Sequence, residues 1–111
     1  MTEEEIFEEI RITKRMLKKL ETWKFADDRR VIKWDVLGHH YEIDQQTDGR
    51  FAGEGEGIVA QTTFWRDDQL HNLNGPALDY NLGDVSKQLY VVKGKAFEYD
   101  EYNFFITAMI P

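Results

Sequence analysis

Histidine is the residue type here best suited to acid–base or metal chemistry, because the chain has three histidines and no cysteine. One of them, His71, lies in the stretch LHNLNGPALDY, residues 70–80, with two asparagines and a Gly-Pro pair. Its imidazole could serve as a general base or a metal ligand. No serine or aspartate stands at a spacing that would complete a catalytic set, so a structural role is favoured. In that role the ring packs against Trp65 or Pro76 and a ring nitrogen bonds a turn carbonyl.

The other two histidines, His39 and His40, follow Gly38 at a predicted turn. Consecutive residues of a strand point to opposite faces, which makes this pair a poor chelate for a metal ion. The stretch GEGEG at residues 53–57 lacks the lysine and the serine or threonine of a phosphate-binding loop, and its intervening residues are anionic. We therefore predict no catalytic residue, no metal site and no cofactor. A small hydrolytic or ligand-binding protein built around His71 is kept as an alternative.

The composition fits a single domain over residues 1–111. Hydrophobic residues make up 41% of the chain, which is enough for one modest core. No apolar run approaches the roughly 18 residues that a membrane-spanning helix needs. The acidic N-terminus does not resemble a secretory signal, and the lack of cysteine is compatible with a reducing compartment. We expect a cytoplasmic protein without membrane contact.

The net charge of −7 is unevenly distributed along the chain. Residues 1–24 carry six basic and six acidic side chains, whereas residues 25–111 carry eight basic and fifteen acidic ones. An acidic surface repels the nucleic-acid backbone and attracts a basic protein surface. We therefore expect a protein partner with a basic surface and no direct nucleic-acid binding. The alternative is that the charge only keeps the domain soluble.

Residues 1–24 are predicted to form one long helix. Thr2 and Glu5 have the spacing of a capping box, in which each side chain satisfies the backbone N–H of the other residue. An apolar stripe recurs at helical spacing and would pack on the rest of the domain. The stripe consists of Ile6, Ile10, Thr13, Leu17 and Leu20, widened by Phe7, Met16 and Trp23.

Residues 31–98 are predicted to form an antiparallel sheet of five to seven strands, because apolar residues alternate with polar ones between short turn signals. Residues 100–110 are predicted to form a short helix with Asp100 as its N-cap. Phe104 extends the apolar face of this helix, and its exposure would favour a partner-binding role. The predicted fold is α+β, with a long N-terminal helix packed on the sheet and a short C-terminal helix.

Three segments of the predicted sheet are similar to one another. Each starts with an aromatic residue, Trp34, Trp65 or Tyr90, and continues through a turn to a second ring, which indicates a degenerate hairpin repeat. Matching Trp65 of the second segment with Tyr90 of the third aligns His71 with Phe97 to within one residue.

The stretch from about residue 64 to residue 105 carries a more specific pattern, with Leu70, His71, Gly75, Pro76, Ala77 and Tyr80. It resembles a repeat of many bacteriophage and bacterial proteins that contains an L-H-x-x-x-G-P-A segment. At a distance it also resembles the MORN-like repeats of antitoxin-type proteins. The resemblance implies a structural repeat and a phage origin, and it implies no catalytic residue.

Together these observations predict a small acidic phage-encoded accessory protein that binds a host protein, such as a defence or nucleic-acid-processing factor, and modulates or inhibits it. An antitoxin-like or immunity-like binder in a bacterial pair is the alternative. Aromatic residues are enriched at interfaces, and acidic rims speed encounter with basic partners. We therefore expect contact on the turn-rich side of the sheet. The candidate residues are Trp65, Asp67, Asp68, Tyr80, Glu54 and Glu56.

Overall fold

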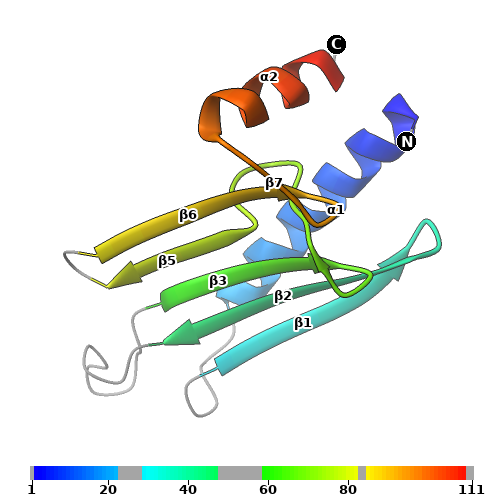
Figure 1. Cartoon of the computed structure of the whole chain (residues 1–111). Coiled ribbons are helices and arrows are strands. Elements are labelled where there is room, and N and C mark those ends of the chain that lie inside the picture. Colours follow the sequence, from blue (N-terminus) through cyan, green and yellow to red (C-terminus); the bar gives the residue numbers. More distant parts are fainter. Residues whose placement is uncertain (1, 23–28, 48–58, 83–84, 110–111) are drawn as a thin grey trace.

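The described part of the chain folds into one antiparallel sheet with two helices (Figure 1). This computed structural model describes residues 2–22, 29–47, 59–82 and 85–109. Helix α1 spans Glu3–Glu21 and helix α2 spans Tyr99–Met109. The strands are β1 (Arg29–Val36), β2 (His39–Thr47), β3 (Val59–Arg66), β4 (Gln69–Leu70), β5 (Leu78–Leu82), β6 (Val85–Val92) and β7 (Lys95–Phe97). The α+β prediction is confirmed.

Helix α1 begins at the predicted cap. The backbone N–H of Glu5 donates to Thr2 Oγ1 at 3.2 Å, and the Thr2 hydroxyl donates to the Glu5 carboxylate at 3.2 Å. The second bond therefore joins two side chains, not the Thr2 N–H and Glu5 as in a full capping box. The helix ends at Glu21, before the predicted residue 24, and Thr22 closes its last turn on the Lys19 carbonyl.

The buried face of α1 differs from the predicted stripe. Phe7 is 46% exposed, whereas Ile12, which lay outside the stripe, is buried. An acid, Glu9, is also buried on this face. The helix is rotated so that Glu9 points at the sheet, because the sheet supplies donors for its carboxylate. Trp23, the last residue of the predicted stripe, lies outside the described residues.

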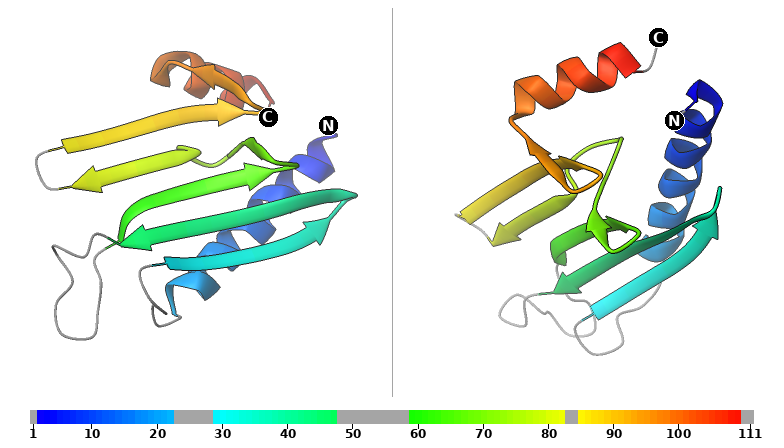
Figure 2. Two further views of the ribbon diagram at one scale, coloured as in Figure 1. Left: turned by 60° about the horizontal axis from the view of Figure 1, so that its bottom comes forward. Right: turned by 45° about the vertical axis from the view of Figure 1, so that its right-hand side comes forward.

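The sheet has the strand order β1-β2-β3-β5-β6-β7, with β4 pairing with β3. Both helices lie on the same face of this sheet (Figure 2). The pairs Trp34–Tyr41 and Ile43–Phe64 put rings and aliphatic side chains on the face toward α1. We call the opposite side the helix-free face; the row Lys33, Glu42, Trp65 lies on it.

Three hairpins share one design. Each is closed by two residues with positive φ, namely Leu37-Gly38, Asp67-Asp68 and Lys93-Gly94. Two-residue turns of this kind match the right-handed twist of the paired strands. They account for the regular spacing of turn signals in the sequence.

A ring three residues before each of these turns lies across from a ring three residues after it. The three pairs are Trp34 with Tyr41, Phe64 with His71, and Tyr90 with Phe97. The predicted match, made from Trp65, placed His71 only within one residue of Phe97, whereas this register makes the two positions equivalent. Phe64, and not Trp65, is the residue equivalent to Trp34 and Tyr90. Trp65 is one position further along the strand and therefore points to the helix-free face.

The core consists of two apolar clusters along α1. One contains Ile6, Leu73, Val92 and Tyr102, and the other contains Leu20, Ile32, Ile43 and Phe64. Because Ile6 and Leu20 belong to different clusters, the middle of α1, with Glu9, lies where the two clusters meet. The buried polar residues described below fill this junction.

Helix α2 begins at Tyr99, one residue before the prediction, so Asp100 lies in its first turn and is not its N-cap. Tyr102, Phe105 and Ile106 pack into the core as predicted. Phe104 is 79% exposed, so its assignment to the apolar face was wrong. No described helix is long and apolar enough to cross a membrane.

Candidate functional site

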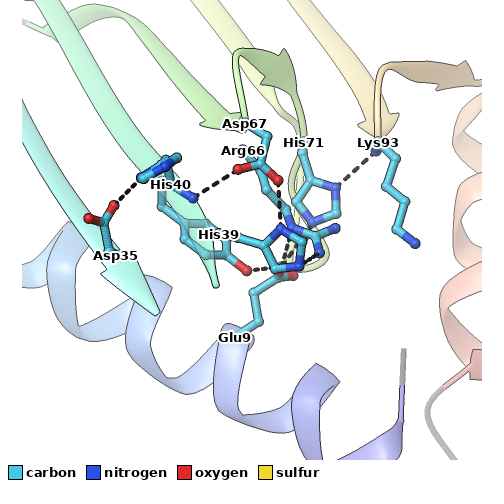
Figure 3. Close-up of polar contacts among 9 residues, drawn as sticks. Glu9, Asp35, His39, His40, Arg66, Asp67, His71 and Lys93 are labelled. Carbon is cyan, nitrogen blue, oxygen red and sulfur yellow. Dashed lines mark hydrogen bonds and ion pairs between the residues drawn. The ribbon is translucent and has the colours of Figure 1, made fainter. Parts of the chain in front are cut away.

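The buried carboxylate of Glu9 organises the polar junction between the two core clusters. Tyr41, from β2, donates its phenolic hydroxyl to Glu9 Oε1 at 2.7 Å. His71, which follows β4, places Nε2 at 3.0 Å from Glu9 Oε2. Arg66, at the end of β3, brings Nε to 3.7 Å from Glu9 Oε1. Figure 3 shows Glu9, Arg66 and His71 converging from the helix and the sheet.

The hydrogen bonds of His71 fix its proton. The backbone N–H of Lys93 donates to His71 Nδ1 at 2.9 Å, so Nδ1 must accept and carries no proton. The proton therefore sits on Nε2 and is donated to Glu9. This differs from the predicted bond to a turn carbonyl, because the neighbouring hairpin presents an amide to the ring. The ring is neutral and has a partner at both nitrogens.

A second histidine extends the same chain of contacts. Arg66 donates from Nη2 to His39 Nε2 at 2.7 Å. A guanidinium can only donate, so the His39 proton sits on Nδ1 and is donated to Asp67 Oδ2 at 2.6 Å. Asp67 also accepts the backbone N–H of His40 at 2.9 Å. These contacts join the turn of the β3–β4 hairpin to the start of β2 (Figure 3).

The electrostatics of the cluster favour an ionised Glu9. Burial works against ionisation, but the hydrogen bonds from His71 and Tyr41 and the charge of Arg66 outweigh it and lower the pKa of Glu9. Burial, and next the bond to the Glu9 carboxylate, raise the pKa of the Tyr41 phenol far above its ordinary value. The buried charges of Glu9 and Arg66 therefore compensate each other.

This cluster is closed to a substrate. Glu9 is 2% exposed and His71 is 4% exposed. The cavity beside them has a volume of about 10 Å³, which is no more than one water molecule occupies. Because both nitrogens of the His71 ring have partners within the fold, the arrangement favours a structural role for His71, and its place in the hairpin repeat supports that role.

A larger hollow lies on the helix-free face of the sheet. Its volume is about 420 Å³. We call it the sheet hollow. It is lined by Lys33, Asp35, His40, Tyr41, Glu42, Trp65 and Asp68. Three carboxylates and one lysine give this surface a negative balance around the half-buried indole of Trp65.

Some of these charges already have partners within the sheet hollow. Lys33 Nζ lies 3.5 Å from Glu42 Oε1. His40 Nδ1 lies 2.5 Å from Asp35 Oδ1, and this bond raises the pKa of the exposed His40 ring. Asp68 forms no ion pair with another described residue. Its carboxylate is thus the one most available to an incoming cation.

The structure brings together part of the predicted contact set. Trp65 and Asp68 both line the sheet hollow. Asp67 instead bonds His39 and the His40 amide. Tyr80 is also on the helix-free face, opposite Gln61 and beyond the sheet hollow. Glu54 and Glu56 lie outside the described residues.

Sequence reasoning did not select Asp35, His40 or Glu42 for the sheet hollow. The alternation of side chains along β1 and β2 could have identified these residues. It places Asp35 and Glu42 on the face of the sheet opposite to the one that Trp34 and Tyr41 occupy. Sequence reasoning also failed to identify Glu9 as a buried polar residue. The available signal was a charged residue three positions after Ile6 and four before Thr13, within the apolar stripe.

Among the described residues, no group of three His, Asp or Glu side chains could hold a metal ion. Comparison of the chain with protein-family models, with curated proteins and with solved structures found no match. The sheet hollow and the charge of the chain are therefore the features that bear on function.

Proposed function

We propose that the chain is a binding protein whose sheet hollow receives a lysine or arginine side chain from a basic partner protein. The observation that carries this proposal is the half-buried Trp65 beside the carboxylates of Asp35, Glu42 and Asp68. An indole face attracts a cation, and nearby carboxylates add a directional ion pair. The net charge of −7 favours encounter with a basic surface.

The turn residue Asp68 gives this proposal further support. It has a φ of +63°, and the equivalent positions in the other two hairpins are Gly38 and Gly94. Glycine adopts this conformation without strain, whereas an aspartate does so at a cost in stability. A carboxylate at a turn position that glycine would occupy without strain, beside Trp65, is consistent with a use in binding.

The biological setting that we propose follows from the L-H-x-x-x-G-P-A resemblance. In it, the chain is a phage-encoded accessory protein that binds a basic host protein and modulates or inhibits it. The exposed ring of Phe104 adds an apolar surface that suits a protein with a partner.

A hexa-arginine peptide provides a direct test of the sheet hollow. Titration followed by NMR should shift the Trp65 indole N–H and the amides of residues 33–42 in the wild type. Asp68→Asn should weaken binding about fivefold, which corresponds to about 1 kcal/mol. Asp100→Asn removes the same charge from α2 and should weaken it far less. Equal weakening by both variants would show that only the overall charge attracts the peptide.

The host partner is then sought with the same matched pair. The wild type, Asp68→Lys and Asp100→Lys are used as baits, and each captured protein is purified and titrated separately. A basic protein that binds the wild type and Asp100→Lys equally, but Asp68→Lys at least tenfold more weakly, would support the proposal. A partner insensitive to Asp68→Lys binds at another surface.

A further inference from the structure

The outer edge of β1 carries backbone groups that no described strand pairs with. The directions of these N–H and carbonyl groups follow from the hydrogen bonds of His40. Its N–H donates to Asp67 Oδ1 at 2.9 Å, and its carbonyl accepts the Asp67 N–H at 2.7 Å. Both groups point away from β1, so Asp35, directly opposite His40, directs its own N–H and carbonyl to the outer edge. By alternation, Lys33 and Val31 do the same.

The side chains along this edge alternate in kind. Lys33 and Asp35 lie on the helix-free face, with side chains 74% and 73% exposed. Ile32, Trp34 and Val36 lie on the other face, and Trp34 and Val36 are only partly buried. The edge therefore presents a charged row of mixed sign on one side and an apolar row on the other.

We propose that two copies of the chain pair through β1, antiparallel and with Trp34 of each copy opposite Trp34 of the other. In this register Lys33 faces Asp35 of the second copy twice, and Ile32 faces Val36 twice. The backbone groups of Lys33 and Asp35 then bond those of the second copy. Trp34 meets its equivalent at a non-hydrogen-bonded pair, where side chains approach most closely and aromatic pairs are favourable.

The neighbouring registers are poorer. The shift that centres the pairing on Lys33 puts two lysines directly opposite, and the shift that centres it on Asp35 puts two aspartates opposite, both of which are unfavourable. The shift that centres it on Ile32 puts the apolar Val31 opposite Lys33, so both Lys33–Asp35 pairs are lost. Edge charges commonly prevent strand association. Here their alternation permits it in one register.

The pairing has a consequence for the helix-free face. A two-fold axis perpendicular to the sheet keeps this face continuous, so the two sheet hollows lie on the same side of the joined sheet. The contact spans residues 32–36 of each copy and is small, so we expect a weak dimer of the kind formed by interfaces below roughly 1,200 Å². The inference does not depend on the proposed partner.

Sedimentation equilibrium tests the register through charge exchange. The wild type should self-associate as concentration rises toward the millimolar range. Lys33→Asp and Asp35→Lys should each weaken self-association roughly tenfold or more, because two attractive pairs become repulsive. An equimolar mixture of the two variants should form a heterodimer about as stable as the wild-type dimer. Lys18→Asp, with the same charge change on α1, should leave the wild-type behaviour unaltered.

A second variant keeps the test independent of either single substitution. The double exchange Lys33→Asp with Asp35→Lys should pair with itself but not with the wild type. A wild type that stays monomeric at all concentrations would overturn the proposal. So would folded single variants that associate as strongly as the wild type, or a mixture of them that remains monomeric.

Discussion

His71 occupies a ring position that the other two hairpins fill with Tyr41 and Phe97, and this explains how a histidine comes to lie in the core. A buried imidazole needs a partner at each nitrogen. Lys93 supplies an amide donor to Nδ1 and Glu9 supplies a carboxylate acceptor to Nε2. The histidine thus replaces an aromatic ring while connecting α1 to the β6–β7 hairpin.

Replacing His71 by alanine should reduce stability and leave partner binding intact. The substitution removes a donor from the buried Glu9 carboxylate and an acceptor from the Lys93 amide, which should lower the free energy of unfolding by roughly 2 kcal/mol. Thermal or urea unfolding measures the loss, with the exposed His40→Ala as control. Lost partner binding at an unchanged melting temperature would instead indicate a chemical role for His71.

The ionised carboxylate of Glu9 makes a pH-dependent contribution to the free energy of unfolding. Folding lowers this pKa from its ordinary value of 4.5, so the contribution is complete above that value and is lost as the pH falls through the folded pKa. Glu9→Gln removes it. The variant should therefore be less stable than the wild type at neutral pH, by roughly 1–3 kcal/mol. This difference should shrink progressively below about pH 4.5.

Urea unfolding at a series of pH values measures the difference for Glu9→Gln. Glu4→Gln removes the same charge from an exposed position of the same helix and is the matched control. A difference that is independent of pH, or equal for both variants, would show that the Glu9 carboxylate is not held ionised by its partners.

The hairpin elements explain the position of Asp68. Two-residue turns with positive φ at both positions strongly favour glycine at the second one, and two of the three turns follow this preference. The third turn, Asp67-Asp68, uses its first aspartate to bond His39 and the His40 amide, and its second to line the sheet hollow. One turn therefore serves both hairpin closure and the proposed binding surface.

This division of roles predicts opposite effects on stability and binding. Asp68→Gly should raise the free energy of unfolding by roughly 0.5–1 kcal/mol, because glycine adopts this turn conformation without strain. It should also weaken binding of the hexa-arginine peptide, because the carboxylate is lost. Unfolding and peptide titration on the same preparation test both effects. A more stable variant with unchanged affinity would remove Asp68 from the binding surface.

The elements themselves were predictable from the sequence because each has a local signal. Helical spacing of apolar residues predicts α1, and period-two alternation with turn residues predicts the strands. The two faces of the sheet also follow from alternation, once the turns are placed. The register of the strands was harder to predict from the sequence. The prediction was displaced by one residue and took Trp65 instead of Phe64 as the repeat aromatic, because both are large rings beside the same turn.

The polar junction could not be predicted in the same way. Glu9 and His71 are 62 positions apart, and only the packing of α1 across the sheet brings them together. Glu9 is one of six charged residues in the first ten positions of α1, so its place within the apolar stripe is only a weak signal that it is buried. The sheet hollow likewise combines β1, β2 and β3, whose alignment depends on the pairing register.

At the level of the whole molecule, charge and fold are arranged on different surfaces. Residues 25–111 carry the entire net charge of −7. Both helices occupy one face of the sheet (Figure 2). Asp35, Glu42 and Asp68 line the sheet hollow on the other face. A basic partner of the kind that we propose would therefore be attracted by the whole acidic segment and would bind at the helix-free face.

Long-range electrostatic attraction between the acidic segment and a basic partner should increase the association rate. The Debye length falls from about 30 Å at 0.01 M salt to about 3 Å at 1 M, so long-range steering is nearly abolished while direct contacts persist. We expect the association rate of the hexa-arginine peptide, measured by stopped-flow mixing, to fall by roughly tenfold or more over this range. The dissociation rate should change less, because it reports contacts already made.

The pair Asp100→Asn with Glu101→Gln, far from the sheet hollow in sequence, should slow association at low salt and leave dissociation unchanged. An association rate that is flat across the salt range would show that the acidic segment does not steer its partner, even if the sheet hollow binds it.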